Sequence, residues 1–477
     1  MGSPVNVNDL GRSSDWSNVN VTVLGLGIAG YAAADNLAFL GAKVTALDES
    51  SSSSLEDKRG LLEFLEVSVI LGQEFEIPPV CDLVIVSPGI HPAHKSIRQA
   101  LEREIAVWGE LELAWRLRGE DAADWLCITG TNGKTTTTLM LESMLRASGL
   151  RSTAAGNIGH SLVEVVMDPA GYDVIAVEVG APQLPYVYSM EPFASVCLNL
   201  AEDHIDLFGD FQSYRDAKAR IYERTQFVAV YNAQDEQTIT MLEEADVREG
   251  CRAIGFSLTT PDRSEVGIVE DFIVDRAFVE NRDTHALEIC KVNDIKPAGI
   301  HNVANALAAI ALARSYGVSA QSIQKGLEQF RPAPHRVSLV REVNGVKYIN
   351  DSKATNAHAA KTSILSFDNV IWIAGGDSKD QDFSELVQSV GKYLKSAILV
   401  GRDQQRIAAA LEKYAPNVTR FSFPGVELEN FKEAIEKASE IAIAGDVILL
   451  APACASWDMF ENYAHRGQVF EEVVRGL

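Results

Sequence analysis

The sequence contains few cysteines, and they are not arranged in pairs. The six cysteines among 477 residues are scattered, with no C-x-x-C motif and no cysteine–histidine spacing of the kind that binds zinc. This pattern argues against a disulfide-stapled domain and against a structural zinc centre. We expect the thiols to be buried as small apolar side chains in a reducing compartment.

Basic residues are also in the minority. Lysine and arginine number 42 against 66 aspartates and glutamates, which gives a formal net charge of −24. General nucleic-acid binding needs a basic surface, so this composition argues against it. A small anionic substrate remains compatible, because a local cluster of lysines and arginines can oppose the overall sign.

Long apolar runs are absent too. No run approaches the roughly 18 residues that cross a bilayer, so we expect no membrane insertion. The first residues, MGSPVNVNDLGRSSDW, have neither a basic start nor an apolar core, and we expect no signal or transit peptide. With 47% apolar and 23% charged residues, the composition is that of a globular protein. At roughly 150 residues per domain, the length predicts about three domains.

Short β-branched runs alternate with helix-like stretches along the whole chain. In three series, we predict strands at 19–24, 44–47, 67–71 and 83–86, at 126–129, 174–179, 195–200 and 227–231, and at 346–349, 370–374, 397–400 and 446–450. Apolar strands that alternate with helices are typical of doubly wound parallel sheets. The sequence therefore predicts an α/β protein with an N-terminal Rossmann-like domain, a central P-loop-type parallel sheet and a C-terminal Rossmann-like domain.

We place the domain boundaries near residues 109 and 332. The stretch 105–120 is predicted to be a helix and a polar turn before a new strand, and the RPAP sequence at 331–334 breaks the chain after a helix. The predicted domains are therefore 1–109, 110–332 and 333–477.

The first predicted strand leads into a glycine-rich turn, GLGIAG at 25–30, ahead of an alanine-rich helix. Such glycines allow a tight turn and a close approach of the helix N-terminus to a diphosphate. Asp48 ends the next strand, where an acid often binds a ribose. By itself the turn is compatible with NAD, FAD, another nucleotide or no ligand. Residues 87–90, SPGI, form a second candidate anion loop after a strand.

The second glycine motif is more specific. The strand at 126–129 opens into GTNGKT at 130–135, at the start of a threonine-rich helix. The backbone of such a loop cradles phosphates, Lys134 can reach the terminal phosphates and the Thr135 hydroxyl can bind Mg²⁺. Ile128 replaces the first glycine of a standard Walker A motif, so the loop is a shortened variant. Two phosphate-type loops in successive domains indicate an ATP-driven enzyme with a nucleotide-bearing second substrate.

Charged side chains follow strands of the middle series. Glu178 ends an apolar strand, which favours a Mg²⁺ ligand over a solvated acid. His204, in the sequence EDHID, follows the next strand, at the sheet edge where ligands gather. A packed, hydrogen-bonded histidine is the alternative interpretation there. Lys218 lies on a predicted helix and, from the residues alone, is expected to be solvated.

The ordered motifs together resemble the Mur ligase family, the ATP-dependent amide-forming enzymes of peptidoglycan precursor synthesis. The motifs are GLGIAG at 25–30, SPGI at 87–90, ITGTNGKTTT at 128–137, GNIG at 156–159, EDHID at 202–206, YRDAKARIY at 214–222, GIHNVANALAA at 299–309, PHR at 334–336, NDSKATN at 350–356, GGDSKDQDF at 375–383 and PACASWDMFENYAHRG at 452–467. Within the family, the glycine turn, the NDSKATN run and the last segment resemble the members that add D-glutamate. The resemblance implies D-glutamate addition to UDP-N-acetylmuramoyl-L-alanine through an acyl phosphate, with ATP and two Mg²⁺ ions.

The resemblance also implies roles for individual residues by matched position. The UDP-substrate contacts would be Gly27, Ile28, Asp48, Ser87, Gly89 and Asn157. The ATP contacts would be Gly130, Thr131, Asn132, Gly133, Lys134, Thr135, Thr136, Asn302, Asn305, Arg336 and Asp351. The D-glutamate pocket would contain Lys353, Thr355, Lys379, Ser456 and Tyr463. The metal ligands would be Thr135, Glu178, His204 and Lys218, the last as a carbamate. The catalytic residues would be Lys134, His204, Lys218 and His335. For Lys218 this replaces the solvated interpretation.

The sequence departs from the family's pattern at three places. Where relatives commonly read E-L-S-S-F-Q-L-E, this chain reads EVGAPQLP at 178–185, which loses two hydroxyls and an aromatic ring. Tyr463 stands where an aromatic residue without a hydroxyl is usual. Serines at 50–54 replace a region that often contains a basic residue near the uracil site.

Three other functions fit part of these motifs. A folylpolyglutamate synthase would share the P-loop and the Lys218 feature but would lack the N-terminal glycine-turn domain. A dinucleotide-dependent dehydrogenase would use the first turn and leave the GTNGKT loop unexplained. A non-enzymatic nucleotide-binding regulator would not need the NDSKATN and PACAS segments. For the ligase we expect a cytoplasmic monomer with no nucleic-acid partner.

Overall fold

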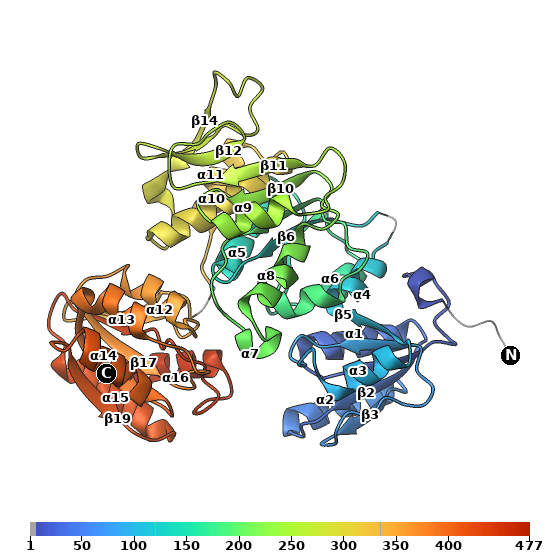
Figure 1. Ribbon diagram of the computed structural model, residues 1–477, viewed down its shortest axis with the longest axis horizontal. Helices are drawn as coiled ribbons and strands as arrows, with labels where there is room; N and C mark the ends of the chain where they lie inside the picture. The colour runs from blue at the N-terminus through green and yellow to red at the C-terminus, as the bar shows by residue number, and fades with distance from the viewer. Residues whose placement is uncertain (1–5, 120, 334) are drawn as a thin grey trace. The chain divides into compact units, whose positions relative to one another are not determined.

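The computed structural model describes residues 6–119, 121–333 and 335–477. Pro334 of the PHR motif and the first five residues of the N-terminal stretch lie outside the described residues. The chain divides into two compact units (Figure 1). The first extends to Ile295 and includes Asn302–Phe330, and the second combines Lys296–His301 with Arg331–Leu477. Within the described ranges, no helix is both long and apolar enough to span a membrane.

The N-terminal part of the first unit is a parallel sheet with the strand order β3-β2-β1-β4-β5. Its strands are β1 (Asn20–Leu24), β2 (Lys43–Asp48), β3 (Ser68–Leu71), β4 (Leu83–Val86) and β5 (Ala106–Gly109). Its helices are η1 (Val7–Asp9), α1 (Ile28–Phe39), α2 (Ser53–Phe64) and α3 (Lys95–Glu102). The helical prediction for 105–120 is wrong at its start, where β5 lies. That strand has four residues and runs directly into α4 (Glu110–Arg116), so its own periodicity is too short to detect.

The middle part of the first unit is a nine-stranded sheet with the order β14-β13-β12-β11-β10-β9-β6-β8-β7. Its strands are β6 (Asp124–Thr129), β7 (Ser152–Gly156), β8 (Val174–Glu178), β9 (Ala194–Cys197), β10 (Val228–Asn232), β11 (Arg252–Phe256), β12 (Glu265–Val269), β13 (Phe272–Asp275) and β14 (Leu287–Lys291). The predicted parallel sheet extends from β7 to β12, and β13 and β14 add an antiparallel edge. Only two residues join β12 to β13, too few for the crossover that parallel strands need.

Helices cover both faces of this sheet (Figure 1). The helices of this part of the chain are α5 (Lys134–Ala147), α6 (Leu162–Met167), η2 (Ala181–Tyr186), α7 (Ile205–Phe208), α8 (Phe211–Ala219), η3 (Arg220–Tyr222), α9 (Glu236–Glu243), η4 (Val292–Asp294), α10 (Ile300–Ser315) and α11 (Ala320–Gln329). On one face, α5, α10 and α11 close an apolar core over the strands. Every residue from Asn305 to Ala313 in α10 is buried, so this helix forms the centre of that layer.

A second apolar core joins the N-terminal sheet to the middle sheet. It includes Trp108 at the end of β5, Leu111 and Leu113 of α4, and Trp125 and Cys127 of β6. The chain therefore passes the predicted boundary near residue 109 without a break in packing. Helix α4 contributes to a core that both sheets share.

The C-terminal unit contains a six-stranded sheet with the order β15-β16-β20-β17-β18-β19, in which only the pair of β15 with β16 is antiparallel. Its strands are β15 (Ser338–Val343), β16 (Val346–Asn350), β17 (Val370–Gly375), β18 (Leu394–Val400), β19 (Thr419–Phe423) and β20 (Val447–Leu450). Its helices are α12 (Ala357–Ile364), α13 (Ser384–Val390), η5 (Gly391–Tyr393), α14 (Gln404–Tyr414), α15 (Leu428–Ile441) and α16 (Tyr463–Gly476). Two apolar clusters, one on each face, fit a doubly wound fold.

Candidate active site

The N-terminal glycine turn joins the carboxyl end of β1 to α1. Gly25 has a φ of +85°, and a methyl group on Gly30 would lie 1.8 Å from the carbonyl oxygen of Gly25. The Asp48 carboxylate accepts the backbone N–H of Leu26 at 2.7 Å. Buried Ser87 donates its hydroxyl to the Gly25 carbonyl at 2.8 Å. Two of the predicted UDP contacts, Asp48 and Ser87, therefore shape the turn itself.

The other predicted UDP contacts are more open. Gly27 caps α1, Ile28 begins that helix with 61% of its surface exposed, and Gly89 and Asn157 are exposed. Lys58 of α2, which the sequence analysis did not single out, donates from Nζ to the backbone of the turn at 2.8 Å. A positive charge thus lies at the glycine turn, although the serines at 50–54 provide none.

Replacing Gly30 with alanine should destabilise the N-terminal sheet. The new methyl group would meet the Gly25 carbonyl, so α1 must shift, at a cost of roughly 1–3 kcal/mol as for other overpacked sites. Urea unfolding measures this. Gly60→Ala is the matched control, because Gly60 lies within α2 with nothing near its Cβ position, and it should stabilise by about 0.5–1 kcal/mol. Equal stability of Gly30→Ala and wild type would contradict the close approach.

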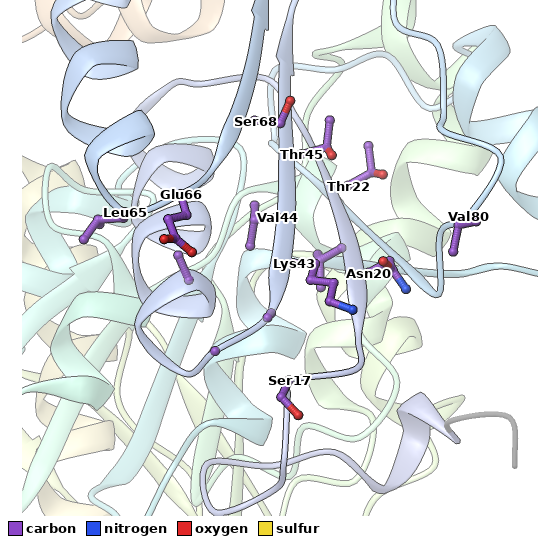
Figure 2. Close-up of a pocket in the computed structure, with 14 residues that line it drawn as sticks. Ser17, Asn20, Thr22, Lys43, Val44, Thr45, Leu65, Glu66, Ser68 and Val80 are labelled. Atoms are coloured by element: carbon purple, nitrogen blue, oxygen red, sulfur yellow. The ribbon is translucent and has the colours of Figure 1, made fainter. Parts of the chain in front are cut away.

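A hollow of about 480 Å³ lies at the amino ends of the strands of the N-terminal sheet, opposite the glycine turn. Figure 2 shows Asn20, Lys43 and Ser68 lining it, and these residues begin β1, β2 and β3. Ligands of doubly wound sheets bind beyond the carboxyl ends of the strands, where the glycine turn is. We therefore assign no substrate to this hollow.

The GTNGKT loop follows the carboxyl end of β6 and curves into α5. Gly130 and Gly133 have φ values of +152° and +84°. A methyl group on Gly133 would lie 2.2 Å from Oδ1 of Asn305, so α10 packs directly against the loop. Lys134 Nζ donates to the carbonyls of Gly130 and Thr131 at 2.8 and 3.0 Å. The amino group of Lys134 therefore lies within the curve of the loop.

The remaining predicted ATP contacts in this unit surround the same loop. Asn132 donates its backbone N–H to Asn199 Oδ1 at 2.9 Å, which fixes the loop's outer side. Thr136 lies half-buried in the first turn of α5. Asn305 Nδ2 donates to Asn302 Oδ1 at 3.4 Å, so these two predicted residues of α10 are neighbours.

Thr135 and Glu178 meet beside the loop. The Thr135 hydroxyl donates to one Glu178 oxygen at 2.6 Å, and Asn157 Nδ2 donates to the other at 2.9 Å. Glu178 is buried, so the solvated interpretation of this acid is wrong. No group of three or more histidine, cysteine, aspartate or glutamate side chains forms a metal site in the described ranges. The oxygens of Thr135 and Glu178 fit Mg²⁺. This ion usually retains several bound waters and binds one or two carboxylates together with the phosphate oxygens of the substrate.

Lys218 is buried beneath the loop, so the expectation of a solvated lysine is wrong. Its Nζ donates to the Gly130 carbonyl at 2.9 Å and to Thr129 Oγ1 at 3.3 Å, and lies 5.1 Å from the centre of the Tyr214 ring. Burial, helped by the charge of Lys134, lowers the pKa of Lys218 to about 7. A large fraction of this amine is therefore uncharged near neutral pH.

His204 is the N-cap of the short helix α7 and has a φ of +54°. Its ring centre is 6.3 Å from that of Tyr214, and the Tyr214 hydroxyl lies 3.0 Å from Thr131 Oγ1 of the loop. The side chain is 39% exposed and its Nε2 is 3.9 Å from an Asp203 oxygen. The histidine is thus on the phosphate-loop side of the sheet and open enough to bind a ligand.

The sequence analysis missed Glu110, a buried acid at the start of α4. Its carboxylate accepts from the Ser161 hydroxyl and the Leu162 N–H, both at 2.8 Å, and from Gln183 Nε2 at 3.4 Å. Gln183 Oε1 in turn accepts the Gly180 N–H at 2.8 Å. Burial raises the pKa of Glu110. Glu110 thus links the two loops that flank Glu178, and its sequence signal was an acid within the apolar run WGELEL.

In the C-terminal unit, the predicted His335 is buried against α16. Its Nδ1 is 2.8 Å from Asn350 Nδ2 and 3.5 Å from Glu471 Oε1, and burial lowers its pKa. Asp351 is also buried, accepting the Val337 N–H at 3.2 Å and the Ser363 hydroxyl. Burial raises the pKa of Asp351 to about 6, and the nearby charge of Arg336 opposes that rise.

The structure brings two of the predicted D-glutamate residues, Lys353 and Tyr463, together. Lys353 Nζ lies 4.0 Å from the centre of the Tyr463 ring. Ser456 is buried, and Thr355 is half-buried two residues beyond Lys353. Lys379 is exposed, and its Nζ lies 5.0 Å from the centre of the ring of Trp457, the residue after Ser456. All five predicted residues lie on loops beyond strand ends or at the start of α16.

Comparison with known proteins matches three consecutive parts of the chain. Residues 19–109 match the Mur ligase MurD-like N-terminal domain, residues 128–313 the Mur ligase middle domain, and residues 335–454 the Mur ligase glutamate ligase domain. The structure is similar to that of UDP-N-acetylmuramate-alanine ligase MurC from Thermotoga maritima, with a TM-score of 0.59 at 17% identity, covering 96% of this chain and 100% of that one. This structural likeness shows the fold alone.

Several relatives cover nearly the whole chain, among them two from Streptomyces. The UDP-N-acetylmuramoylalanine–D-glutamate ligase of Streptomyces avermitilis is 46% identical over 97% of this chain and 99% of its own length. The ligase of the same name from Streptomyces coelicolor is 45% identical over the same shares. The family resemblance inferred from the motifs is confirmed, and the chain belongs to the Mur ligase family.

Proposed function

We propose that this chain is an ATP-dependent ligase that joins the amine of D-glutamate to the alanine carboxylate of UDP-N-acetylmuramoyl-L-alanine. The observation that carries the proposal is the 46% identity, over nearly the full length of both chains, to a ligase named for this pair of substrates. The paired Thr135 and Glu178 beside a phosphate loop support the use of ATP with Mg²⁺.

In this proposal the phosphate loop binds ATP. Gly130, Thr131, Asn132 and Gly133 offer backbone N–H groups, and Lys134 moves from the loop carbonyls to the terminal phosphates. Thr136, Asn302, Asn305, Arg336 and Asp351 complete the nucleotide contacts. Gly27, Ile28, Asp48, Ser87, Gly89 and Asn157 bind the UDP substrate. The diphosphate then lies at the N-terminus of α1, where backbone N–H groups and the helix dipole favour an anion.

The proposed metal ligands are Thr135, Glu178, His204 and a carbamate on Lys218, for two Mg²⁺ ions. An uncharged, buried amine is the form that reacts with CO₂, and the lowered pKa of Lys218 supports this modification. The bound ions supply charge neutralisation for the transferred phosphoryl group. Asn157 holds the Glu178 carboxylate in orientation through its 2.9 Å hydrogen bond.

The reaction proceeds in two steps. An oxygen of the alanine carboxylate attacks the γ-phosphorus of ATP, and ADP leaves with its electron pair, which gives an acyl phosphate. The amine of D-glutamate then attacks the acyl carbon, loses a proton and expels phosphate to form the amide. Lys134 stabilises the negative charge of the phosphoryl group during transfer. His335 orients the start of the NDSKATN loop, because its backbone carbonyl accepts the Lys353 N–H at 3.2 Å.

The C-terminal unit provides the amino-acid pocket in this proposal. Lys353 and Lys379 pair with the two carboxylates of D-glutamate, and Thr355, Ser456 and Tyr463 donate or accept further hydrogen bonds. We place the domain boundaries near residues 109 and 332, and we propose a cytoplasmic monomer. Sedimentation of the purified protein tests the last point.

The decisive assay is phosphate release from ATP and Mg²⁺ with UDP-N-acetylmuramoyl-L-alanine and a panel of amino acids that includes both glutamate enantiomers. We expect release with D-glutamate alone. Release with a different amino acid would retain the ligase chemistry but contradict the proposed substrate. No release with any amino acid would contradict the proposed acyl substrate. Omission of the UDP substrate is the matched control, because hydrolysis of ATP without it is not ligation.

A further inference from the structure

Arg466 is a fully buried arginine that the proposed reaction does not use. It lies in the first turn of α16, and only 2% of its surface is exposed. Moving a guanidinium out of water is costly unless the group is well hydrogen-bonded or paired with an acid. Burial accordingly lowers its pKa to about 10, so the side chain remains charged at neutral pH.

Five hydrogen bonds hold this guanidinium, and all of their acceptors are neutral. Nε donates to Ser352 Oγ at 3.0 Å and Nη2 to the Ser352 carbonyl at 2.8 Å. Nη1 and Nη2 both donate to the Cys454 carbonyl at 3.2 Å, and Nη1 also donates to the Ala455 carbonyl at 3.3 Å. In the described part of the chain, no carboxylate accepts a hydrogen bond from Arg466. Its positive charge is therefore solvated by oxygen dipoles rather than held by a hydrogen-bonded carboxylate.

These bonds join the three segments that contain most of the predicted amino-acid pocket. Ser352 precedes Lys353 in the NDSKATN loop, and Ala455 precedes Ser456 in the PACAS loop. Ser352 Oγ also donates to the Tyr463 carbonyl at 2.7 Å, which ties the first loop to the start of α16. Four of the five predicted pocket residues are thus one or a few residues away from atoms that Arg466 holds.

The packing around Arg466 leaves little room for another arrangement. Gly376 has a φ of +134°, and a methyl group there would lie 2.3 Å from the Ala455 carbonyl and 3.4 Å from Arg466 Nη1. Asp458 is the acid whose charge acts most on Arg466, but its Oδ2 accepts the Arg402 N–H at 2.9 Å, and no hydrogen bond joins it to the guanidinium among the described residues. The guanidinium is therefore fixed in place, and it forms no hydrogen-bonded ion pair with the nearest acid.

We propose that Arg466 is a positioning residue that holds the three segments of the amino-acid pocket together and whose buried positive charge favours an amino acid with two carboxylates. The inference rests on the proposed function, which assigns D-glutamate to this pocket. A fixed positive charge in a buried, weakly polar surrounding acts on a carboxylate without contact, more strongly than it would in water. Arg466 would thus add to the direct contacts of Lys353 and Lys379.

The test uses full-length Arg466→Gln and Arg466→Lys. For Arg466→Gln we expect the KM for D-glutamate to rise about tenfold or more, with the KM values for ATP and the UDP substrate within about twofold of wild type. Arg466→Lys keeps the charge but loses most of the fork of donors, so its KM for D-glutamate should rise less. Unchanged KM for D-glutamate in a folded Arg466→Gln would overturn the proposal.

Inhibition by D-glutamine separates the charge from a purely structural role. D-Glutamine has the size of D-glutamate but one carboxylate fewer, so the proposed charge should favour D-glutamate over it. We expect the ratio of the D-glutamine inhibition constant to the D-glutamate KM to be lower in Arg466→Gln than in wild type. In Arg466→Lys the ratio should stay close to the wild-type value. A ratio that is the same in both variants and in wild type would contradict the role of the charge.

Ser352→Ala keeps the proposal testable if Arg466→Gln does not fold. This variant removes the acceptor of Nε and the donor to Tyr463 but keeps the guanidinium. We expect a raised KM for D-glutamate with the preference over D-glutamine retained, and an unchanged KM would contradict the positioning role. Ser439→Ala is the matched control. Ser439 lies in α15, which contains no predicted pocket residue, and its hydroxyl lies 2.8 Å from the Tyr348 hydroxyl. Failure of wild type to respond to D-glutamate would contradict the proposed function instead.

Discussion

Lys134→Met should abolish turnover while the protein stays folded. The amino group of Lys134 lies within the phosphate loop, bonded at 2.8 and 3.0 Å to two loop carbonyls. Methionine keeps the length and the apolar stem of the side chain but removes the charge that would stabilise the transferred phosphoryl group. We expect kcat to fall by about 10³-fold or more, the size of effect seen when one such charge is lost.

Phosphate release and thermal unfolding together check this prediction. The half-buried lysine contributes two hydrogen bonds to the backbone, so its loss should cost only about 1–3 kcal/mol of stability. Lys325→Met is the matched control, because Lys325 is exposed on α11 of the same unit, and it should keep wild-type activity. Full activity in a folded Lys134→Met would remove the assignment of the loop to ATP.

Lys218→Met should also inactivate the enzyme, and wild-type activity should depend on CO₂. The buried Lys218 amine lies beneath the phosphate loop, 2.9 Å from the Gly130 carbonyl. A carbamate there converts a cation into an anion with two oxygens that can bind Mg²⁺. Loss of a residue that only supports a metal ligand lowers metal affinity or activity by about 10–100-fold. For a direct ligand we therefore expect kcat to fall by more than about 10²-fold.

The CO₂ dependence separates a carbamate from an ordinary buried lysine. Wild-type protein in CO₂-depleted buffer should lose activity and regain it on addition of bicarbonate. With the pKa of Lys218 lowered to about 7, the ammonium form prevails below that pH, so recovery should be weaker at pH 6 than at pH 8. Intact mass spectrometry of the native protein should show one CO₂ adduct, absent in Lys218→Met. Activity that is indifferent to bicarbonate at both pH values would exclude the modification.

Strands that are buried on both faces were predictable from the sequence. Residues 83–86 are predicted and observed as β4, because every one of its four positions is buried and apolar. β7 was missed, since its sequence Ser-Thr-Ala-Ala-Gly is short and contains no large apolar residue. The antiparallel edge of β13 and β14 was missed as well. Its direction depends on a two-residue connection rather than on the strands' own residues.

The residues of the site likewise divide into those that were predictable from the sequence and those that were not. The glycines of the two turns, Lys134 and Glu178 were recognisable because their chemistry needs those residue types at fixed positions after a strand. Glu110 and Arg466 were not, because a charged residue near a helix start usually faces solvent and only its burial among specific hydrogen-bond partners reveals a role.

The sequence by itself determined the order of α/β elements, the two phosphate-type turns and the family, since these depend on local spacing along the chain. Only the tertiary structure decided that Lys218 is buried beneath the phosphate loop and that Glu110 links the loops around Glu178. It also decided that Arg466 joins two loops to the start of α16, with no carboxylate accepting its hydrogen bonds among the described residues. Burial and hydrogen bonding depend on groups far apart in the chain, and folding alone brings those groups together.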